Sequence, residues 1–451
     1  MQHSESSKGP WYAGITSYQW LVLTIASLGW VFDVFEGQLL LSSEKQMLTD
    51  LLPGVTEEGT RDYYKYVALA AFLAGGALGG VVFGALADRI GRSRTMIITI
   101  LMYSFFTCLT AFSQSWWQVV VLRFLVALGV GGEWAVASAM VAEVFPPRAR
   151  AWSGAIFHSS STFGTYLAVA AGIFVVPVWG WQWAFLLGAL PALLTVWIRW
   201  QMREPEQWVA AQAKITSRQS FGGQLMSLFA PGIAGRTVLG FSLAVIGLAT
   251  YWGVHVNGKE LTLRRARAVV ESEARMEAGA TAEQRSLLWK EHEKYLKRWE
   301  MFGMLMTATG GGIGLFAFGP IAEWLGRRWA FALFHVGGLV MGVLLFQTYR
   351  GWNGGVFTAL LTLFGFCTLG MHAGYAIYFP ELYPTRLRSL GSGFCFNFAR
   401  LTTAVMLVVN GWLLHVGVPL ETAGSLLALL FLVGATIIWF GPETKGTTLA
   451  A

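Results

Sequence analysis

Charged residues are scarce in this chain. Asp, Glu, Lys and Arg together make up only 13% of its 451 residues, whereas hydrophobic residues make up 55%. A soluble domain carries about 25% charged residues, so this chain lacks the charge that a water-exposed surface needs. The shortage excludes an ordinary soluble protein and predicts a membrane protein whose outer surface faces a lipid bilayer.

Patterns that bind metals or nucleotides are missing as well. The three cysteines, Cys108, Cys367 and Cys395, lie inside apolar stretches without the spacing of metal ligands. No Gly-Lys-Ser/Thr loop and no catalytic cluster of acidic or histidine residues is present. We therefore expect no metal and no cofactor, and the absences argue against an ATP-driven permease and an enzyme acting on lipid-linked substrates. We expect no nucleic-acid partner despite the net charge of +7, because the basic residues cluster in short loops.

Long apolar stretches dominate the chain instead. A membrane-spanning helix needs about 20 such residues, and the basic loops after alternate spans mark the cytoplasmic side. We expect a multi-pass protein of the plasma membrane, namely a bacterial inner membrane, with both termini in the cytoplasm. The twelve predicted spans are 17–42, 64–87, 95–113, 116–142, 151–177, 181–200, 233–255, 299–322, 329–349, 353–379, 389–415 and 420–440.

The chain also repeats itself. E-V-F-P-P-R-A-R (143–150) returns as E-L-Y-P-T-R-L-R (381–388), 381 − 143 = 238 residues later, and the segment 84–92 returns at 319–327. Duplicated apolar halves are the usual architecture of a transporter, with its binding site where the halves meet. We predict an all-α membrane fold of twelve helices in two pseudo-symmetric six-helix bundles. The predicted boundaries are 1–200 and 233–442 for the bundles, 201–232 for a cytoplasmic linker and 443–451 for a cytoplasmic tail.

One segment departs from this pattern. Residues 256–298 carry many charges of both signs and read as two polar helices broken at Gly279. We expect an outer helical insertion, exposed to solvent as a hairpin, whose removal leaves transport nearly intact. The alternative is that it docks on a partner or on the acidic loop that follows the first span.

Several motifs give the chain a family resemblance. G-A-L-A-D-R-I-G-R-S-R-T-M (84–96) resembles the loop signature of the major facilitator superfamily, and R-F-L-V-A-L-G-V-G (123–131) is similar to its sugar-porter-like branch, with Ala127 in place of one glycine. G-G-E-W (131–134) resembles the sialate, lactate and metabolite proton symporters of that branch. The resemblance implies proton-coupled symport of a small organic anion by alternating access, in a protein that functions as a monomer.

Two other functions stay open. The glutamines that bind sugar hydroxyls in sugar porters are absent from 158–164 and 250–257, which favours a monocarboxylate or sugar acid over a neutral sugar. A neutral sugar or polyol porter remains the alternative, and a third reading is a transporter-like membrane receptor that signals through its outer insertion.

Three charged residues within the spans are candidates for proton coupling. An ionisable side chain inside a bilayer is costly and marks a functional site. Asp33 and Glu36 lie three residues apart on one helix, and Arg123 lies on the fourth span. The resemblance implies that Asp33 pairs with Arg123 and carries the proton. The alternatives are a purely structural ion pair and, for Glu36, a local hydrogen bond.

Arg400 is the candidate anion anchor, because a guanidinium is a planar fork of donors that suits a carboxylate. The alternative is that Arg400 pairs with Asp33 or Glu36 across the bundle. The other side chains expected to contact substrate are Asn397, His158, His372, Tyr251 and Tyr375.

The resemblance also implies a cytoplasmic gate. Charged residues at helix ends would hold the two bundles together there, and Glu133 would serve gating rather than substrate binding. The expected gate residues are Asp88, Arg92, Glu133, Glu143, Arg148 and Arg150 in the first half and Glu323, Arg327, Glu381, Arg386 and Arg388 in the second.

Overall fold

The computed structural model describes residues 12–204, 209, 221–276, 279–383 and 388–445. Within these ranges the chain is helical and has no β-strand. The first half contains α1 (Ser17–Leu51), α2 (Glu58–Ile90), α3 (Arg92–Thr110), α4 (Trp116–Val144), α5 (Pro147–Ser159), α6 (Ser161–Ala170), a π-helical turn (Ala171–Val175), α7 (Val176–Trp179), α8 (Trp181–Leu187) and α9 (Ala192–Gln201).

The second half is built in the same way. It contains α11 (Phe221–Ser227), α12 (Ala234–Gly253), a 3-10 turn (His255–Asn257), α13 (Gly258–Glu273), α14 (Ala282–Glu291), α15 (Glu293–Leu325), α16 (Arg327–Thr348), α17 (Gly354–Gly370), α18 (His372–Leu382), α19 (Arg388–His415), α20 (Leu420–Ala428), α21 (Leu430–Ile437) and a 3-10 turn (Ile438–Phe440). The predicted linker 201–232 therefore includes α11, and its residues 205–208 and 210–220 lie outside the described residues.

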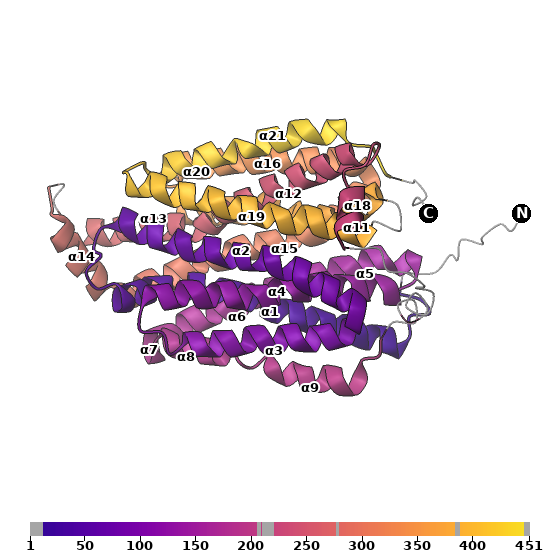
Figure 1. Cartoon of the computed structure of the whole chain (residues 1–451). Helices are drawn as coiled ribbons and strands as arrows, with labels where there is room; N and C mark the ends of the chain where they lie inside the picture. The colour runs from indigo at the N-terminus through magenta and orange to yellow at the C-terminus, as the bar shows by residue number, and fades with distance from the viewer. Residues whose placement is uncertain (1–11, 205–208, 210–220, 277–278, 384–387, 446–451) are drawn as a thin grey trace, which may run out of the picture.

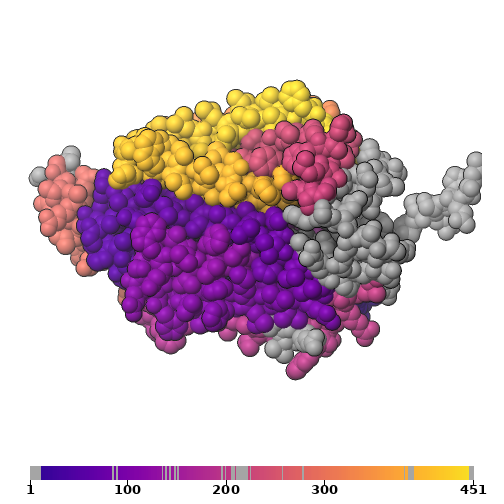
Figure 2. All heavy atoms as spheres, in the orientation of Figure 1, coloured from indigo at the N-terminus to yellow at the C-terminus, as the bar shows by residue number. Residues whose placement is uncertain are grey.

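The two halves lie side by side along the long axis of the molecule (Figure 1). Helix α2 of the first half packs along α19 of the second, and α5 and α6 pack against α15. Figure 2 shows the two halves in contact along the visible face. Helix α14 projects from the end opposite the one at which α1 begins (Figure 1). We call these the insertion end and the terminal end.

Glycines let the helices of each half approach until their backbones touch. A Cβ atom on Gly75 of α2 would lie 2.1 Å from the carbonyl oxygen of Phe124 in α4, and one on Gly310 of α15 would lie 1.8 Å from that of Thr362 in α17. Small residues serve this purpose in membrane bundles, where van der Waals packing rather than a hydrophobic driving force joins helices. Gly75 and Gly310 are 310 − 75 = 235 positions apart, the spacing of the sequence repeat.

Eleven helices within the described ranges are long and apolar enough to cross a membrane. The predicted span 181–200 is built differently: α8 and α9 are separated by turns at residues 188–191. Pro191 has no N–H to donate to the preceding turn and disfavours a helical residue before it. Gly188 lies in close contact with α1, since a Cβ atom there would lie 2.5 Å from the Glu36 Oε1 atom.

The insertion is part of the packed structure rather than an exposed hairpin. Helix α13 begins at Gly258, and Lys259 and Glu260 are buried in its first turn. At its other end, α15 begins at Glu293, within the segment predicted as insertion, and continues through the membrane as one helix. The prediction that the charges of 256–298 face solvent is therefore wrong for its ends, because α13 and α15 pack against each other and reach α1.

Candidate functional site

A cavity lies between the two halves. It is lined by α1, α2, α4, α5 and α6 of the first half and by α12, α13, α15, α17, α18 and α19 of the second. Aromatic side chains form much of the wall, namely Trp30, Phe72, Tyr251, Trp252 and Phe396. The wall also carries three charged residues, Asp33, Lys259 and Arg400, and three histidines, His158, His255 and His372. Sequence alone predicted most of these polar positions but missed Lys259.

Arg400 enters the cavity from α19 and has no charged partner in contact. Its guanidinium carbon lies 4.9 Å from the centroid of the Phe396 ring, and a Cβ atom on Gly76 would lie 2.9 Å from its Nη1 atom. Among the described residues, no hydrogen bond or ion pair within 4.0 Å holds this side chain. It is nevertheless only 8% exposed. A buried guanidinium in a cavity, with no hydrogen-bond or ion-pair partner among the described residues, is suited to bind an anion.

Asp33 faces the same cavity from α1. It is 1% exposed, and neither carboxylate oxygen has a hydrogen-bond partner among the described residues. The cation that acts on it electrostatically is Arg400 of the other half, although the two form no ion pair within 4.0 Å in the described chain. The cavity therefore places a carboxylate of one half opposite a guanidinium of the other.

Arg123 does not form the expected ion pair with Asp33. Its guanidinium donates to the hydroxyl groups of Thr107 at 3.4 Å and Thr110 at 3.1 Å, and to the backbone carbonyl of Glu36 at 3.4 Å. Within the described residues, no ion pair within 4.0 Å joins Arg123 to the carboxylate of Asp33 or to that of Glu36. The expected pair is absent because hydroxyl and carbonyl oxygens of α1 and α3 take up the guanidinium donors away from the cavity wall.

Two other buried carboxylates lie behind the wall in the first half. Glu36 accepts a hydrogen bond from the Thr107 hydroxyl at 2.6 Å, and Glu133 accepts one from the Thr99 hydroxyl at 3.0 Å. One oxygen of Glu133 touches α1, since a Cβ atom on Gly29 would lie 2.7 Å from it. Neither glutamate lines the cavity. Glu133 packs inside the first half, so its predicted gating role stays a prediction.

The remaining predicted substrate residues divide into two groups. His158, His372 and Tyr251 line the cavity, and the Tyr251 hydroxyl accepts a hydrogen bond from the Gln38 side chain of the other half at 2.7 Å. Asn397 and Tyr375 do not line it. Asn397 packs against Gly80 of α2, where a Cβ atom would lie 2.4 Å from its amide, and the Tyr375 hydroxyl donates to the Leu243 carbonyl at 3.0 Å.

At the terminal end, three of the predicted gate residues meet within the second half. Arg327 forms two contacts with the Glu381 carboxylate, at 2.9 and 3.2 Å, and one with Glu323 at 2.8 Å. Arg92 begins α3, where its backbone N–H donates to Glu204 at 2.6 Å. The predicted role of these residues in joining the halves stays a prediction. Outside the described parts of the chain lie Arg386 and the side chains of Asp88, Glu143, Arg148, Arg150 and Arg388.

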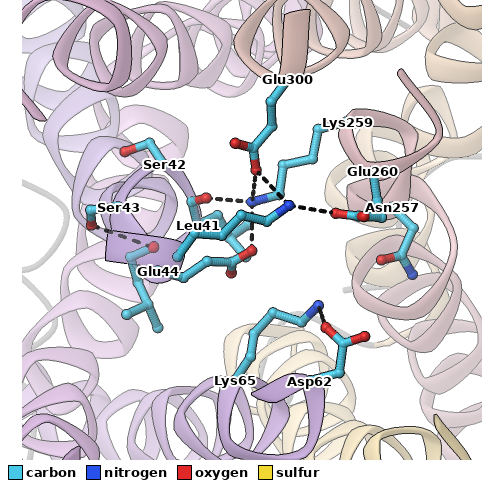
Figure 3. Close-up of polar contacts among 12 residues, drawn as sticks. Leu41, Ser42, Ser43, Glu44, Asp62, Lys65, Asn257, Lys259, Glu260 and Glu300 are labelled. Atoms are coloured by element: carbon cyan, nitrogen blue, oxygen red, sulfur yellow. Dashed lines mark hydrogen bonds and ion pairs between the residues drawn. The ribbon is translucent and has the colours of Figure 1, made fainter. Parts of the chain in front are cut away.

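A group of charges lies at the insertion end, and Figure 3 shows part of it. Its contacts favour the alternative expectation that the insertion docks on the acidic segment after the first predicted span, because Lys259 contacts Glu44 and Arg267 lies 3.1 Å from Glu58. The Lys259 ammonium donates to Glu44 at 2.9 Å and lies 3.5 Å from Glu300. Lys45 lies 3.0 Å from Glu260 and 3.7 Å from Glu300. We call these residues the insertion-end cluster: Glu44, Lys45, Lys259, Glu260, Lys297 and Glu300. The sequence signal for it is a pair of opposite charges at the end of each of three predicted spans, Glu44 with Lys45, Lys259 with Glu260 and Lys297 with Glu300.

Known proteins share both the sequence pattern and the fold. Residues 39–268 match the sequence model of the Major Facilitator Superfamily. The chain is 26% identical to a putative metabolite transport protein of Haemophilus influenzae, over 96% of this chain and 99% of that protein. It is also 26% identical to the putative niacin/nicotinamide transporter NiaP of Bacillus subtilis, over 95% and 97%. The structure of the proton:xylose symporter XylE bound to 6-bromo-6-deoxy-D-glucose matches with a TM-score of 0.68 at 17% identity, covering 96% of this chain and 98% of that one, which shows the fold.

Proposed function

The chain belongs to the Major Facilitator Superfamily and is a secondary transporter, and we propose that it carries a small organic anion together with a proton through the cavity between its halves. The observation that carries this proposal is the Arg400 guanidinium, which is buried in the cavity wall without a hydrogen-bond or ion-pair partner among the described residues. A carboxylate that enters the cavity would meet a cation whose donors are unused, in surroundings where charge-assisted hydrogen bonds are strong.

The position of Asp33 supports coupling to a proton. Arg400 is the cation that acts on Asp33 across the halves. A substrate carboxylate bound to Arg400 would offset that positive charge and leave Asp33 as an uncompensated anion. Binding a proton at Asp33 removes that charge, so the anion and the proton bind favourably together. This coupling rests on electrostatics between two cavity residues and needs no direct contact between them.

The balance of buried charges supports the same conclusion. Asp33, Glu36 and Glu133 are at most 1% exposed, whereas Arg123 and Arg400 are the two arginines near them. Three carboxylates and two guanidinium groups are neutral together only when one carboxyl group holds a proton. Because uncompensated charge in such surroundings is costly, a resident proton is part of the proposed resting state.

The comparisons are in keeping with a small solute. The relative from Bacillus subtilis is named for niacin or nicotinamide. The aromatic wall formed by Trp30, Phe72 and Tyr251 would suit an organic acid with an apolar body. We further propose a monomer in a bacterial inner membrane, with both termini in the cytoplasm and the insertion end outside.

Uptake by the purified protein in liposomes tests this function. With an imposed pH gradient, acidic outside, we expect the parent to accumulate a monocarboxylate such as benzoate or lactate well above its accumulation of xylose. Asp33→Asn should abolish accumulation but retain exchange of substrate across the membrane. Asp50→Asn is the matched control, because Asp50 lies on the same helix outside the cavity wall and accepts a hydrogen bond from Trp181 at 2.9 Å.

The outcomes separate the competing functions. Accumulation of xylose in preference to every acid would favour a neutral sugar porter. Binding of a ligand without any uptake or exchange would favour a receptor. Accumulation of the acid by Asp33→Asn at the parent's level would show that Asp33 is not the coupling residue.

A further inference from the structure

The insertion-end cluster joins the two halves of the transporter. Lys259 of α13 donates to Glu44 and to the backbone carbonyl of Leu41, both in α1. In the opposite direction, Lys45 of α1 reaches Glu260 of α13 at 3.0 Å. Each of these contacts crosses from the first half to the second, and Figure 3 shows those of Lys259 with Leu41 and Glu44. The first turn of the insertion is therefore attached to the bundle that it faces.

Helix α15 contributes the centre of the cluster. The Lys297 ammonium donates to the Ser42 carbonyl of α1 at 2.6 Å and lies 3.1 Å from Glu300. Glu300 is within 3.7 Å of all three lysines of the cluster, because Lys259 and Lys45 approach it at 3.5 and 3.7 Å. Its side chain is only 2% exposed. Loss of the Glu300 carboxylate would remove the negative charge that all three ammonium groups share.

The cluster lies at the wall of the cavity. Lys259 and Leu41 both line the cavity, and the hydrogen bond between them connects the halves at that point. At this end of the cavity, α1 of the first half faces α13 and α15 of the second, and the cluster joins them. We propose that the insertion-end cluster is a lock that closes the cavity at this end and must break for the cavity to open there, whichever solute the cavity takes.

The chemistry of the cluster suits a contact that breaks and re-forms. Three lysines face three glutamates, so the closed cluster has no net charge. The hydrogen bonding is nevertheless incomplete. Glu44 Oε2 has no hydrogen-bond partner among the described residues, and Glu300 Oε1 has lysines near it only at the longer distances of 3.5 and 3.7 Å. Burying ions costs several kcal/mol each unless their partners are excellent. Opening the halves would return these groups to water, so the closed and open states can be close in free energy.

A distance measurement at the insertion end tests the lock. Gly54, between α1 and α2, and Gly354, at the start of α17, belong to different halves, and a Cβ atom on either would meet nothing within 4 Å. Cysteines at these positions, in a variant with Cys108, Cys367 and Cys395 replaced by serine, can carry spin labels. Double electron–electron resonance on the full-length protein in lipid nanodiscs, without substrate, then measures the distance between the two labels and thereby the separation of the halves. The result does not depend on whether the protein transports anions.

The key variant is Glu300→Gln, which removes one charge with little change in shape. We expect the population with the longer separation to rise at least about tenfold relative to the closed population, because breaking a buried pair leaves uncompensated charge. Lys259→Gln should act in the same direction through Glu44. Glu300→Asp keeps the charge and should stay close to the parent. Asp62→Asn is the matched control, because Asp62 pairs at 2.5 Å with Lys65 of the same helix.

A second pair of labels checks that opening at one end accompanies closing at the other. Gly154 of α5 and Gly235 of α12 lie at the terminal end in different halves, and a Cβ atom on either would meet nothing within 4 Å. We expect their distance to shorten in Glu300→Gln. Two results would overturn the lock: parental distances in both Glu300→Gln and Lys259→Gln, or an equal lengthening in Asp62→Asn.

Discussion

Glu204 and Glu443 hold the first turns of two equivalent helices. Glu204 accepts hydrogen bonds from the N–H groups of Arg92 and Ser93 in α3, at 2.6 and 3.1 Å. Glu443 accepts them from Arg327 and Arg328 in α16, at 3.0 and 3.1 Å. Because the first N–H groups of a helix have no partner within it, a carboxylate there stabilises the helix. The two glutamates, 443 − 204 = 239 residues apart, thus have the same structural role at the ends of the two halves.

The glycine before each helix belongs to the same arrangement. Gly91 and Gly326 have φ angles of +112° and +91°, a region that favours glycine. A Cβ atom on Gly91 would lie 2.4 Å from Glu204, and one on Gly326 would lie 2.7 Å from Glu443. We expect replacement of either glutamate by glutamine to lower the unfolding free energy by about 1 kcal/mol. Thermal unfolding in detergent measures the loss, and Glu323→Gln, whose side chain is 66% exposed, should cost much less.

The contribution of Glu443 should depend on pH. Partial burial alone would raise its pKa, but hydrogen bonds from the backbone N–H groups of Arg327, Lys445 and Arg328 lower the pKa of Glu443 below its ordinary value. A lowered pKa stabilises the fold above the unfolded-state value, and the stabilisation is lost as pH falls through the folded-state value. The difference in melting temperature between the parent and Glu443→Gln should be constant near neutral pH and shrink below about pH 4.3. A difference that persists unchanged in acid would contradict the capping role.

Arg400 should set the preference for anions. Arg400→Lys keeps the charge but loses the planar fork, so it should weaken binding of a carboxylate, and Arg400→Gln should weaken it by about 2–5 kcal/mol. The amide of the same acid should lose much less. Titrations of benzoate and benzamide on the parent and both variants measure the difference. Equal losses for acid and amide would show that Arg400 only balances Asp33.

Arg123 provides the comparison for that experiment. It is also buried, but its guanidinium donates to Thr107, Thr110 and the Glu36 carbonyl behind the cavity wall. Arg123→Lys should therefore lower thermal stability and change acid and amide binding in equal proportion. A selective loss of acid binding in this variant would place Arg123, rather than Arg400, at the anion site.

The insertion should tolerate shortening only in its middle. Replacing 276–291 by a short Gly/Ser bridge removes α14 and keeps α13, Lys297 and Glu300, so uptake should stay near the parent's level. Extending the deletion to 259–298 removes Lys259, Glu260 and Lys297 and should strongly reduce coupled uptake, because the cavity loses its closure at the insertion end. Fluorescence size-exclusion profiles identify variants that fail to fold. Normal uptake by the folded larger deletion would show that the insertion takes no part in closure.

The sequence predicted which elements exist better than which side chains meet. Apolar stretches, the repeat and the family motifs indicate a two-bundle membrane fold, and a charge inside an apolar stretch directed attention to Asp33 and Arg400, which do line the cavity. Which of the other predicted side chains face the cavity depends on the rotation of each helix about its axis. Asn397 is three residues before Arg400, about 60° round the helix axis, and that angle turns it toward Gly80 rather than into the cavity.

The sequence does not show which side chains pair between distant segments, because this also depends on how each helix is rotated about its axis. Nothing near Arg123 in the sequence shows that its donors go to α3 hydroxyls rather than to Asp33. Lys259 lies in a strongly charged stretch, which favours solvent exposure, yet α1 covers it in the folded chain. Burial of a charge depends on a partner that is distant in sequence, here 259 − 44 = 215 residues away at Glu44.

In each half, cavity-lining side chains and the glycines that pack helix against helix lie on different faces of the same helix. On α2, Phe72 faces the cavity while Gly75 touches α4, and on α15, Met304 faces the cavity while Gly310 touches α17. Side chains that line the cavity therefore lie on different faces from the close backbone contacts between the helices of each half. Exchanging wall residues such as Phe72 or Met304 can alter what is carried without disturbing how the halves move, which makes the chain a practical starting point for engineering new substrate preferences.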